Sequence, residues 1–315
     1  GSYQIVALDL EEYSFDPGSK ARCRATEGTV LSRIPPRMKV RRNSPLELPH
    51  VMLLIDDPDN TVIEAAFGKA KEEGLPVTYD VTLMKDSGEV KGTCVPCDSL
   101  TASVITDGLA ALGEASADGL IYLVGDGNHS LATAKALWDE IKISLVEEER
   151  KDHPARFALT EVVNIHDKGL KFEPIYRIVR GISADDILAE ADKFFGQGTP
   201  SGDSVSFVVT DGTNDKTVVV NDPPHMLSVG CVGLFLDDLA KRGQGIGIDY
   251  IHGEDELRSL AKEGNGKSAG ILLPGISKNT FFDTIRKEGV FPRKTFSMGQ
   301  AFEKRFYLEA RKIII

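Results

Sequence analysis

The chain has 315 residues and a formal net charge of −11 at pH 7. A chain of this length buries one large or two ordinary cores, and two domains are the better expectation. The acidic balance argues against a nucleic-acid partner, because such a surface needs clustered Lys and Arg in excess. With no apolar run of roughly 20 residues and no signal peptide, we expect a cytoplasmic protein without a membrane partner.

The four cysteines are too few and too scattered for a disulfide framework, which fits a reducing compartment. Cys94 and Cys97 form a lone Cys-x-x-Cys pair in a predicted loop. Thioredoxin-like chemistry needs a helix N-terminus that lowers the thiol pKa, and this loop has none. The histidines share no ligand spacing, so we expect no metal site made of the protein's own residues.

Strand-like and helix-like segments alternate in the first half of the chain. Short apolar or alternating runs predict strands at 5–8, 51–55, 77–83, 90–94 and 120–124. Apolar residues spaced by three and four predict helices at 62–73, 101–112 and 131–145. We expect an irregular stretch up to Val30. The basic run 33–42 then begins with Pro35 and Pro36, which exclude a helix at its start, so it is either a solvated strand face or a phosphate clamp.

The second half continues the alternation. Strands at 157–165 and 174–179 are expected to pair with each other, and Gly181 marks a boundary. Beyond it, Ser183 caps a helix that runs to Phe195. The remaining predicted elements are a hairpin of 205–209 and 217–220, helices at 233–241, 254–263 and 278–288, and strands at 246–251 and 269–273. The pattern predicts an α/β or α+β protein with domains 1–181 and 182–315.

The segment 125–130, Gly-Asp-Gly-Asn-His-Ser, stands between a predicted strand and a predicted helix. Asn128, His129 or Ser130 is expected at or near the N-cap of this helix. The first amides of a helix have no partner inside it and carry the positive end of its dipole, so they suit a phosphate. An inert turn needs neither Asp126 nor an imidazole, whereas phosphoryl transfer needs a base and phosphate donors.

Three separated motifs resemble those of the DUF1015 family. Residues 124–135 resemble its Asp-Gly-His-His-Arg motif, Glu27 falls where the family has His-Glu-x-Thr, and 292–296 match Pro-x-Lys-Ser/Thr. The resemblance runs nearly end to end, although we expect an upstream segment of long members to be lacking. It departs at Thr26, Asn128 and Ser130, which stand where the family has His, His and Arg.

The resemblance implies a ParB and sulfiredoxin-like nucleotide-binding domain followed by a second α/β domain that closes a cleft. Relatives include free serine kinases that use ADP or ATP, so it implies a small-molecule kinase for a hydroxylated metabolite, with serine as the first candidate and Mg²⁺ as cofactor. Glu27 would take the proton of the substrate hydroxyl, and Asp126 would assist it or hold Mg²⁺. The implied nucleotide-binding residues are Gly125, Gly127, Asn128, His129, Ser130, Lys294 and Thr295, and Arg37 or Arg293 would add positive charge.

The alternative function is a non-catalytic nucleotide-binding module or switch of the ParB-like type. Sulfiredoxin-like reduction is disfavoured, because that chemistry needs a nucleophilic cysteine in the phosphate motif and 125–130 contain none. A nuclease is disfavoured by the acidic balance. The two main hypotheses therefore differ in one outcome. A kinase binds the nucleotide and turns it over, whereas a non-catalytic module binds it without turnover.

Overall fold

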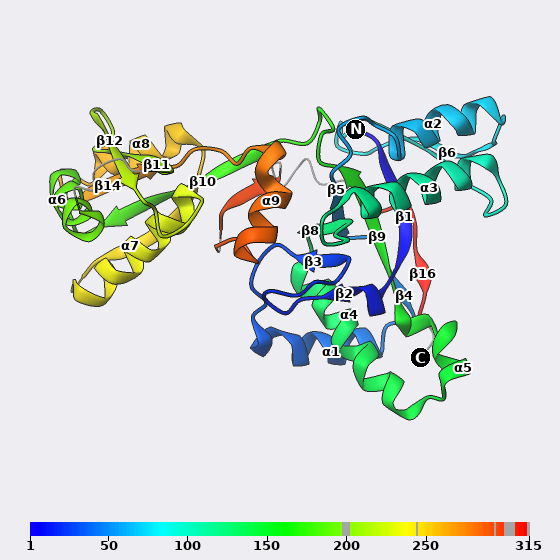
Figure 1. The fold of residues 1–315 in the computed structure, drawn as a ribbon. Helices are drawn as coiled ribbons and strands as arrows, with labels where there is room; N and C mark the ends of the chain where they lie inside the picture. Colours follow the sequence, from blue (N-terminus) through cyan, green and yellow to red (C-terminus); the bar gives the residue numbers. More distant parts are fainter. Residues whose placement is uncertain (197–201, 244, 293, 299–305, 314–315) are drawn as a thin grey trace. The chain divides into compact units, whose positions relative to one another are not determined.

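The computed structural model describes residues 1–196, 202–243, 245–292, 294–298 and 306–313. The chain divides into two compact units (Figure 1), the first made of Gly1–Lys171 with Gly299–Ile315 and the second of Phe172–Met298. The N-terminal stretch of the first unit therefore ends at Lys171, before the boundary expected at Gly181. Within the described ranges, no helix combines the length and the apolarity that crossing a membrane requires.

The first unit is built on a mixed sheet. Its strands, in spatial order, are β1 (Tyr3–Asp9), β9 (Phe157–Asn164), β5 (Val51–Ile55), β8 (Tyr122–Asp126), β3 (Cys23–Ala25) and β2 (Tyr13–Ser14). β1 is antiparallel to β9, and β5 is antiparallel to β8, whereas the pairs β5–β9, β3–β8 and β2–β3 are parallel. The short strands β2 and β3 lie in the stretch that was expected to be irregular.

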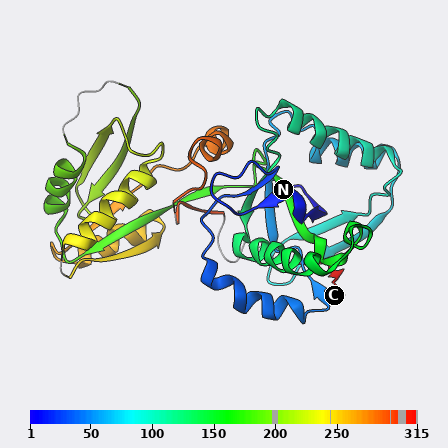
Figure 2. The same cartoon turned by 60° about the horizontal axis from the view of Figure 1, so that its bottom comes forward.

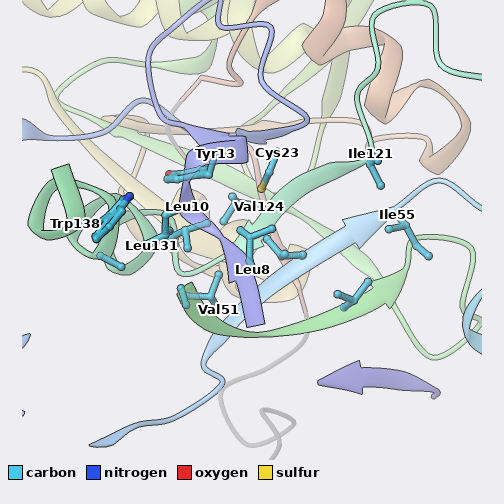
Figure 3. Packing of buried hydrophobic residues seen from close by; sticks show 14 of the residues in the cluster. Leu8, Leu10, Tyr13, Cys23, Val51, Ile55, Ile121, Val124, Leu131 and Trp138 are labelled. Atoms are coloured by element: carbon cyan, nitrogen blue, oxygen red, sulfur yellow. The ribbon is translucent and has the colours of Figure 1, made fainter. Parts of the chain in front are cut away.

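Helix α4 (Asn128–Ile141) packs on this sheet through the apolar face that its spacing predicts. Leu131 and Trp138 are fully buried against Leu10 and Tyr13 (Figure 3). The indole Nε1–H of Trp138 donates to Glu11 Oε1 at 2.7 Å, so the one polar atom of this large side chain is satisfied. This packing holds the helix, and with it the turn at its N-terminus, against the sheet.

The basic run forms a helix, so the expectation that its prolines exclude a helix at the start was wrong, and so was the alternative of a strand face. Helix α1 spans Ile34–Arg42 and begins with the two prolines in its first turn. Proline is tolerated there because the first N–H groups of a helix need no intrahelical acceptor. α1 packs beside α4 (Figures 1 and 2).

Further elements complete the first unit. Helices α2 (Ile63–Glu72) and α3 (Leu100–Ala115) pack against each other, and strands β6 (Val77–Thr82) and β7 (Glu89–Thr93) form an antiparallel ribbon between them in sequence. Helix α5 spans Glu147–Lys151. Near the C-terminus, β16 (Arg311–Lys312) pairs with β4 (Leu46–Glu47), so the end of the described chain returns to the first unit.

The second unit contains an antiparallel sheet. Its order is β12 (Asp215–Asn221), β11 (Ser204–Thr210), β14 (Ser268–Leu272), β10 (Phe172–Arg180) and β13 (Gly247–His252), and β15 (Phe296–Met298) also pairs with β10. The expected pairing of 157–165 with 174–179 was wrong. β1 and β5 occupy the two edges of β9, and β10 pairs with strands of its own unit.

Helices cover both faces of this second sheet. On β10, Val179 packs with α6 (Ala184–Phe195) and α7 (Ser228–Arg242), whereas its neighbour Ile178 packs with α8 (Glu254–Glu263). Successive residues of a strand point to opposite faces, so one strand serves two layers. Ser183 caps α6 by accepting from the Asp186 N–H, as predicted. Helix α9 (Lys278–Glu288) also belongs to this unit.

Candidate functional site

The glycine-rich cluster lies where β8 ends and α4 begins. β8 includes Gly125 and Asp126, and Gly127 follows as the N-cap with a left-handed backbone (φ 85°, ψ 20°). A Cβ at residue 127 would lie 3.0 Å from Val51 Cα, so both the backbone and the available space require glycine. The cap itself is Gly127, because the turn needs a residue without a side chain, and residues 128–130 lie directly after it, near the N-cap as expected.

Residues 128–130 form the first turn of α4. Intrahelical bonding begins at Leu131, whose N–H donates to Gly127 O at 3.0 Å. The three preceding amides have no acceptor within the helix, and they carry the positive end of the helix dipole. Such a turn stabilises a phosphate placed beside it.

The side chain of Asn128 is buried and joins this turn to the segment after β3. Its Oδ1 accepts from the Thr26 N–H at 3.3 Å, and its Nδ2 donates to Thr26 Oγ1 at 3.4 Å. The Thr26 hydroxyl in turn donates to Val124 O at 2.6 Å. Because its amide is engaged in this way, Asn128 offers a ligand its backbone N–H.

The same contacts bring two predicted carboxylates to one edge of the sheet. β3 and β8 are parallel, with Ala25 opposite Val124. Glu27 and Asp126 each lie two residues further along, and both are partly buried. Asp126 Oδ1 accepts from the Gly127 N–H at 2.7 Å. Residues 27 and 126 therefore follow the same edge of the sheet, beside the start of α4.

His129 connects the first turn of α4 to the start of the α1 segment. Its Nε2 accepts from the Val30 N–H at 3.2 Å. At the other end of the two helices, Arg42 forms an ion pair of 2.5 Å with Glu140. The helices therefore run in the same direction, with their N-termini on the same side.

Arg37 lies in this parallel helix and is exposed. Within the described residues, its guanidinium has no hydrogen bond or ion pair. The basic run therefore forms a helix face that is largely exposed to solvent. That Arg37 adds positive charge to a nucleotide site stays a prediction.

Ser130 contacts a residue that the sequence did not single out. The Ser130 Oγ lies 2.5 Å from His50 Nε2, and His50 Nδ1 lies 3.2 Å from Leu48 O. His50 immediately precedes β5, which runs antiparallel to β8 with Met52 opposite Asp126. The pairing of β5 with β8 is what brings His50 close to Ser130. The spacing of the two residues in the sequence does not predict this contact.

Lys294 and Thr295 belong to the second unit. Thr295 is buried and its hydroxyl donates to Pro292 O at 2.5 Å, while Lys294 is exposed with a positive φ of 57°. The Lys294 carbonyl accepts from Arg177 Nη2 at 3.0 Å. Burial lowers the pKa of Arg177 to about 10. Arg293 lies outside the described residues.

An aromatic cluster supports this turn. Phe281 stacks on Phe172 with ring centroids 5.0 Å apart, and Phe291 and Phe296 pack against Phe281 at 4.7 Å and 5.4 Å. Such a cluster contributes through apolar burial and ring geometry. Phe291 and Phe296, which flank the described residues Lys294 and Thr295, thus both take part in this aromatic packing.

Fold and site together define a mixed α/β protein with a glycine-capped helix N-terminus beside two carboxylates. The chain belongs to the family described as "Protein of unknown function (DUF1015)", whose family model matches residues 4–243. This match confirms the family to which the three motifs pointed. No curated protein matches the chain significantly.

Several solved structures are similar to this chain. A variant of a free serine kinase in complex with AMP has 11% identity and a TM-score of 0.46, over 96% of this chain and 89% of that chain. A conserved hypothetical protein from Pyrococcus furiosus has 13% identity and a TM-score of 0.40, over 96% of this chain and 92% of that chain. SbnI with a C-terminal truncation from Staphylococcus aureus has 8% identity and a TM-score of 0.44, over 94% of this chain and 83% of that chain. Similarity this weak assigns no activity to this chain.

Proposed function

We propose that this protein is a nucleotide-dependent phosphotransferase that acts on a small hydroxylated metabolite, with serine as the first candidate and ADP or ATP as donor. One observation carries the proposal: two residues with carboxylates, Glu27 and Asp126, follow the strand pair β3–β8 at the edge of the sheet where the first turn of α4 begins. Phosphoryl transfer needs a base for the attacking hydroxyl and fixed donors for the phosphate charge. The order of the three family motifs supports the same assignment.

In this proposal Glu27 accepts the proton of the acceptor hydroxyl as that oxygen attacks the phosphorus. A positioned general base contributes about 10²- to 10⁴-fold to the rate. The amides of 128–130 and the backbone at Gly125 and Gly127 hold the phosphate oxygens and stabilise the charge that develops on them. These groups are fixed before the ligand arrives, because α4 is anchored in the core through Trp138.

The carboxylates also fit the proposed Mg²⁺. This ion is usually held by one or two carboxylates and by the phosphates of the substrate, and it keeps several waters. Asp126 would supply such a ligand, while Glu27 remains the proposed base. When bound, the ion would neutralise phosphate charge, while Asp126 holds its orientation through the Gly127 N–H.

The proposal retains ligand contacts for Lys294, Thr295 and Arg37, as the family resemblance implies. Lys294 and Arg37 are exposed, so their charges are accessible to an anion. Thr295 differs, because its hydroxyl already donates to Pro292 O. We therefore expect Lys294→Ala to weaken nucleotide binding more than Thr295→Val does.

The test is phosphorus NMR of the protein with Mg²⁺, serine and either ADP or ATP. O-phosphoserine is the expected product, and Glu27→Gln should slow its formation at least about 100-fold. Glu114→Gln, which changes an exposed glutamate in α3, is the matched control and should leave the rate unchanged. No phosphorylated product with serine or other hydroxylated acceptors, in any variant, would end the proposal.

A non-catalytic nucleotide-binding module is the second candidate. It is favoured by the engagement of Asn128, His129 and Ser130 in side-chain hydrogen bonds within the protein, which leaves backbone amides as their ligand donors. Calorimetry would then show nucleotide binding without turnover. His129→Ala should reduce that binding, because it releases Val30 from the first turn of α4.

A further inference from the structure

Ser130 and His50 have the arrangement of a nucleophile and its base. The two reacting atoms, Ser130 Oγ and His50 Nε2, lie 2.5 Å apart. An activated nucleophile is recognised by this contact together with a third group that orients the base. Here the third group is Leu48 O, which lies 3.2 Å from His50 Nδ1.

The carbonyl determines which nitrogen of His50 acts as the base. A carbonyl oxygen only accepts hydrogen bonds, so Nδ1 must carry the proton and donate to Leu48 O. A neutral imidazole then presents an unprotonated Nε2, which accepts from the Ser130 hydroxyl. The ring of Tyr307 packs edge-to-face against His50 with centroids 6.4 Å apart, which further limits the ring's orientation.

The position of Ser130 favours a phosphate on its side chain. Ser130 is the third residue of α4, a helix of 14 residues, and both Ser130 and His50 are accessible to solvent. A phosphoserine near a helix N-terminus is stabilised by the dipole and by unpaired amides. The reactant could therefore reach the hydroxyl, and the product would be held where it forms.

We propose that Ser130 is itself a phosphoryl acceptor and that His50 is its catalytic base. Ser130 Oγ attacks the terminal phosphorus of the bound nucleotide, the bond from phosphorus to the bridging oxygen breaks, and the nucleotide leaves one phosphate shorter. The hydroxyl proton passes to His50 Nε2 and then to solvent. This inference rests on the proposed function for its donor, but the reactivity of Ser130 is measurable without a nucleotide.

The first experiment uses an alkyl fluorophosphonate, which forms a Ser Oγ–P bond with loss of fluoride and needs no nucleotide. Mass spectrometry of the full chain should find the label on Ser130, none there in Ser130→Ala, and a rate about 100-fold lower in His50→Gln. Ser103→Ala and His252→Gln are exposed controls that should label at the original rate. Absence of label on Ser130 in a folded protein overturns the proposal, because the contact would then be a structural link between β5 and α4.

The second experiment incubates the full chain with Mg²⁺ and ATP or ADP labelled in the terminal phosphate. Phosphoserine at residue 130, lost in His50→Gln, is the expected result. Calorimetry on the same samples separates loss of labelling from loss of binding. O-phosphoserine formation without phosphate on Ser130 would refute this inference and leave the proposed function standing, whereas a protein that binds no nucleotide would contradict both.

Discussion

Asn128 holds Thr26 through both of its polar side-chain atoms, accepting from the Thr26 N–H at Oδ1 and donating to the Thr26 hydroxyl from Nδ2. The pair joins two segments more than a hundred residues apart and lies one residue from Glu27. A residue that departs from the family motif therefore has a structural task that positions the proposed base.

Replacing Asn128 tests this task. Asn128→Ala leaves the buried Thr26 N–H without its acceptor, and an unsatisfied buried group costs about 1–3 kcal/mol. We expect urea unfolding to show a loss of that size, with phosphotransfer reduced further because Glu27 is released. Asn43→Ala removes an exposed asparagine of the same unit and should change stability much less. Equal stability of the two variants would contradict the assignment.

Gly127→Ala should destabilise the first unit for two separable reasons. A left-handed backbone costs a residue with a Cβ about 1–2 kcal/mol, and the new Cβ would also meet Val51 Cα at 3.0 Å. Gly88 has nearly the same φ, 88°, but open space around it, so Gly88→Ala reports the backbone cost alone. The difference between their urea midpoints measures the contact with Val51, and no difference would show that β5 yields to the new methyl group.

The ion pair of Asp215 with Arg258 makes the second unit sensitive to acid. Hydrogen bonds from Arg258, followed by Thr210, lower the pKa of Asp215 from 3.8 to about 2. A carboxylate with a depressed folded-state pKa contributes stability above its unfolded pKa and loses it as the pH falls from about 3.8 through 2. Asp215 is largely exposed, so the contribution is small.

The Asp215 contribution is measurable by comparing variants. Asp215→Asn should lower the thermal midpoint at pH 6, and the difference from the original protein should vanish near pH 2 if both remain folded. Asp237→Asn, an exposed carboxylate in α7, should show no such pH dependence. A difference that persists at low pH would show that Asp215 acts through packing instead of charge.

The four cysteines should divide into two reactivity classes. Cys94 and Cys97 are exposed, whereas Cys23 and Cys231 are buried and burial raises the pKa of both thiols. Because the thiolate is the reactive form, iodoacetamide should modify only Cys94 and Cys97 in the native protein. Mass spectrometry before and after urea treatment checks this. Rapid native labelling of Cys23 would show that the sheet opens at β3.

Local pattern alone predicted many elements of this chain. Strand β5 and helices α8 and α9 have the predicted bounds, and the hairpin of β11 and β12 forms where its turn residues indicated. These elements are recognisable because an apolar period of two or 3.6 residues reflects the backbone conformation of the segment itself. The strand-to-helix turn at 125–130 was predicted for the same reason.

The basic run forms a helix despite its two prolines. Pro35 and Pro36 occupy the first turn, where proline removes no needed hydrogen bond. The sequence contained this signal, since a helix N-terminus is the position that tolerates proline.

Other features depended on partners distant in the sequence. Strand pairing places β9 and β10 in different sheets, and it also brings His50 next to Ser130. A strand's own residues do not specify which neighbouring strand will hydrogen-bond to its edge. Likewise, from the sequence alone Asn128 only replaces a family histidine that would donate to phosphate. Its structural role is visible only in its hydrogen bonds to Thr26. Most of the elements, the turn at 125–130 and the family were predictable from sequence, because their signals are local. The strand order and the partners of each site residue depend on tertiary packing, because those contacts join segments that only the folded chain brings together.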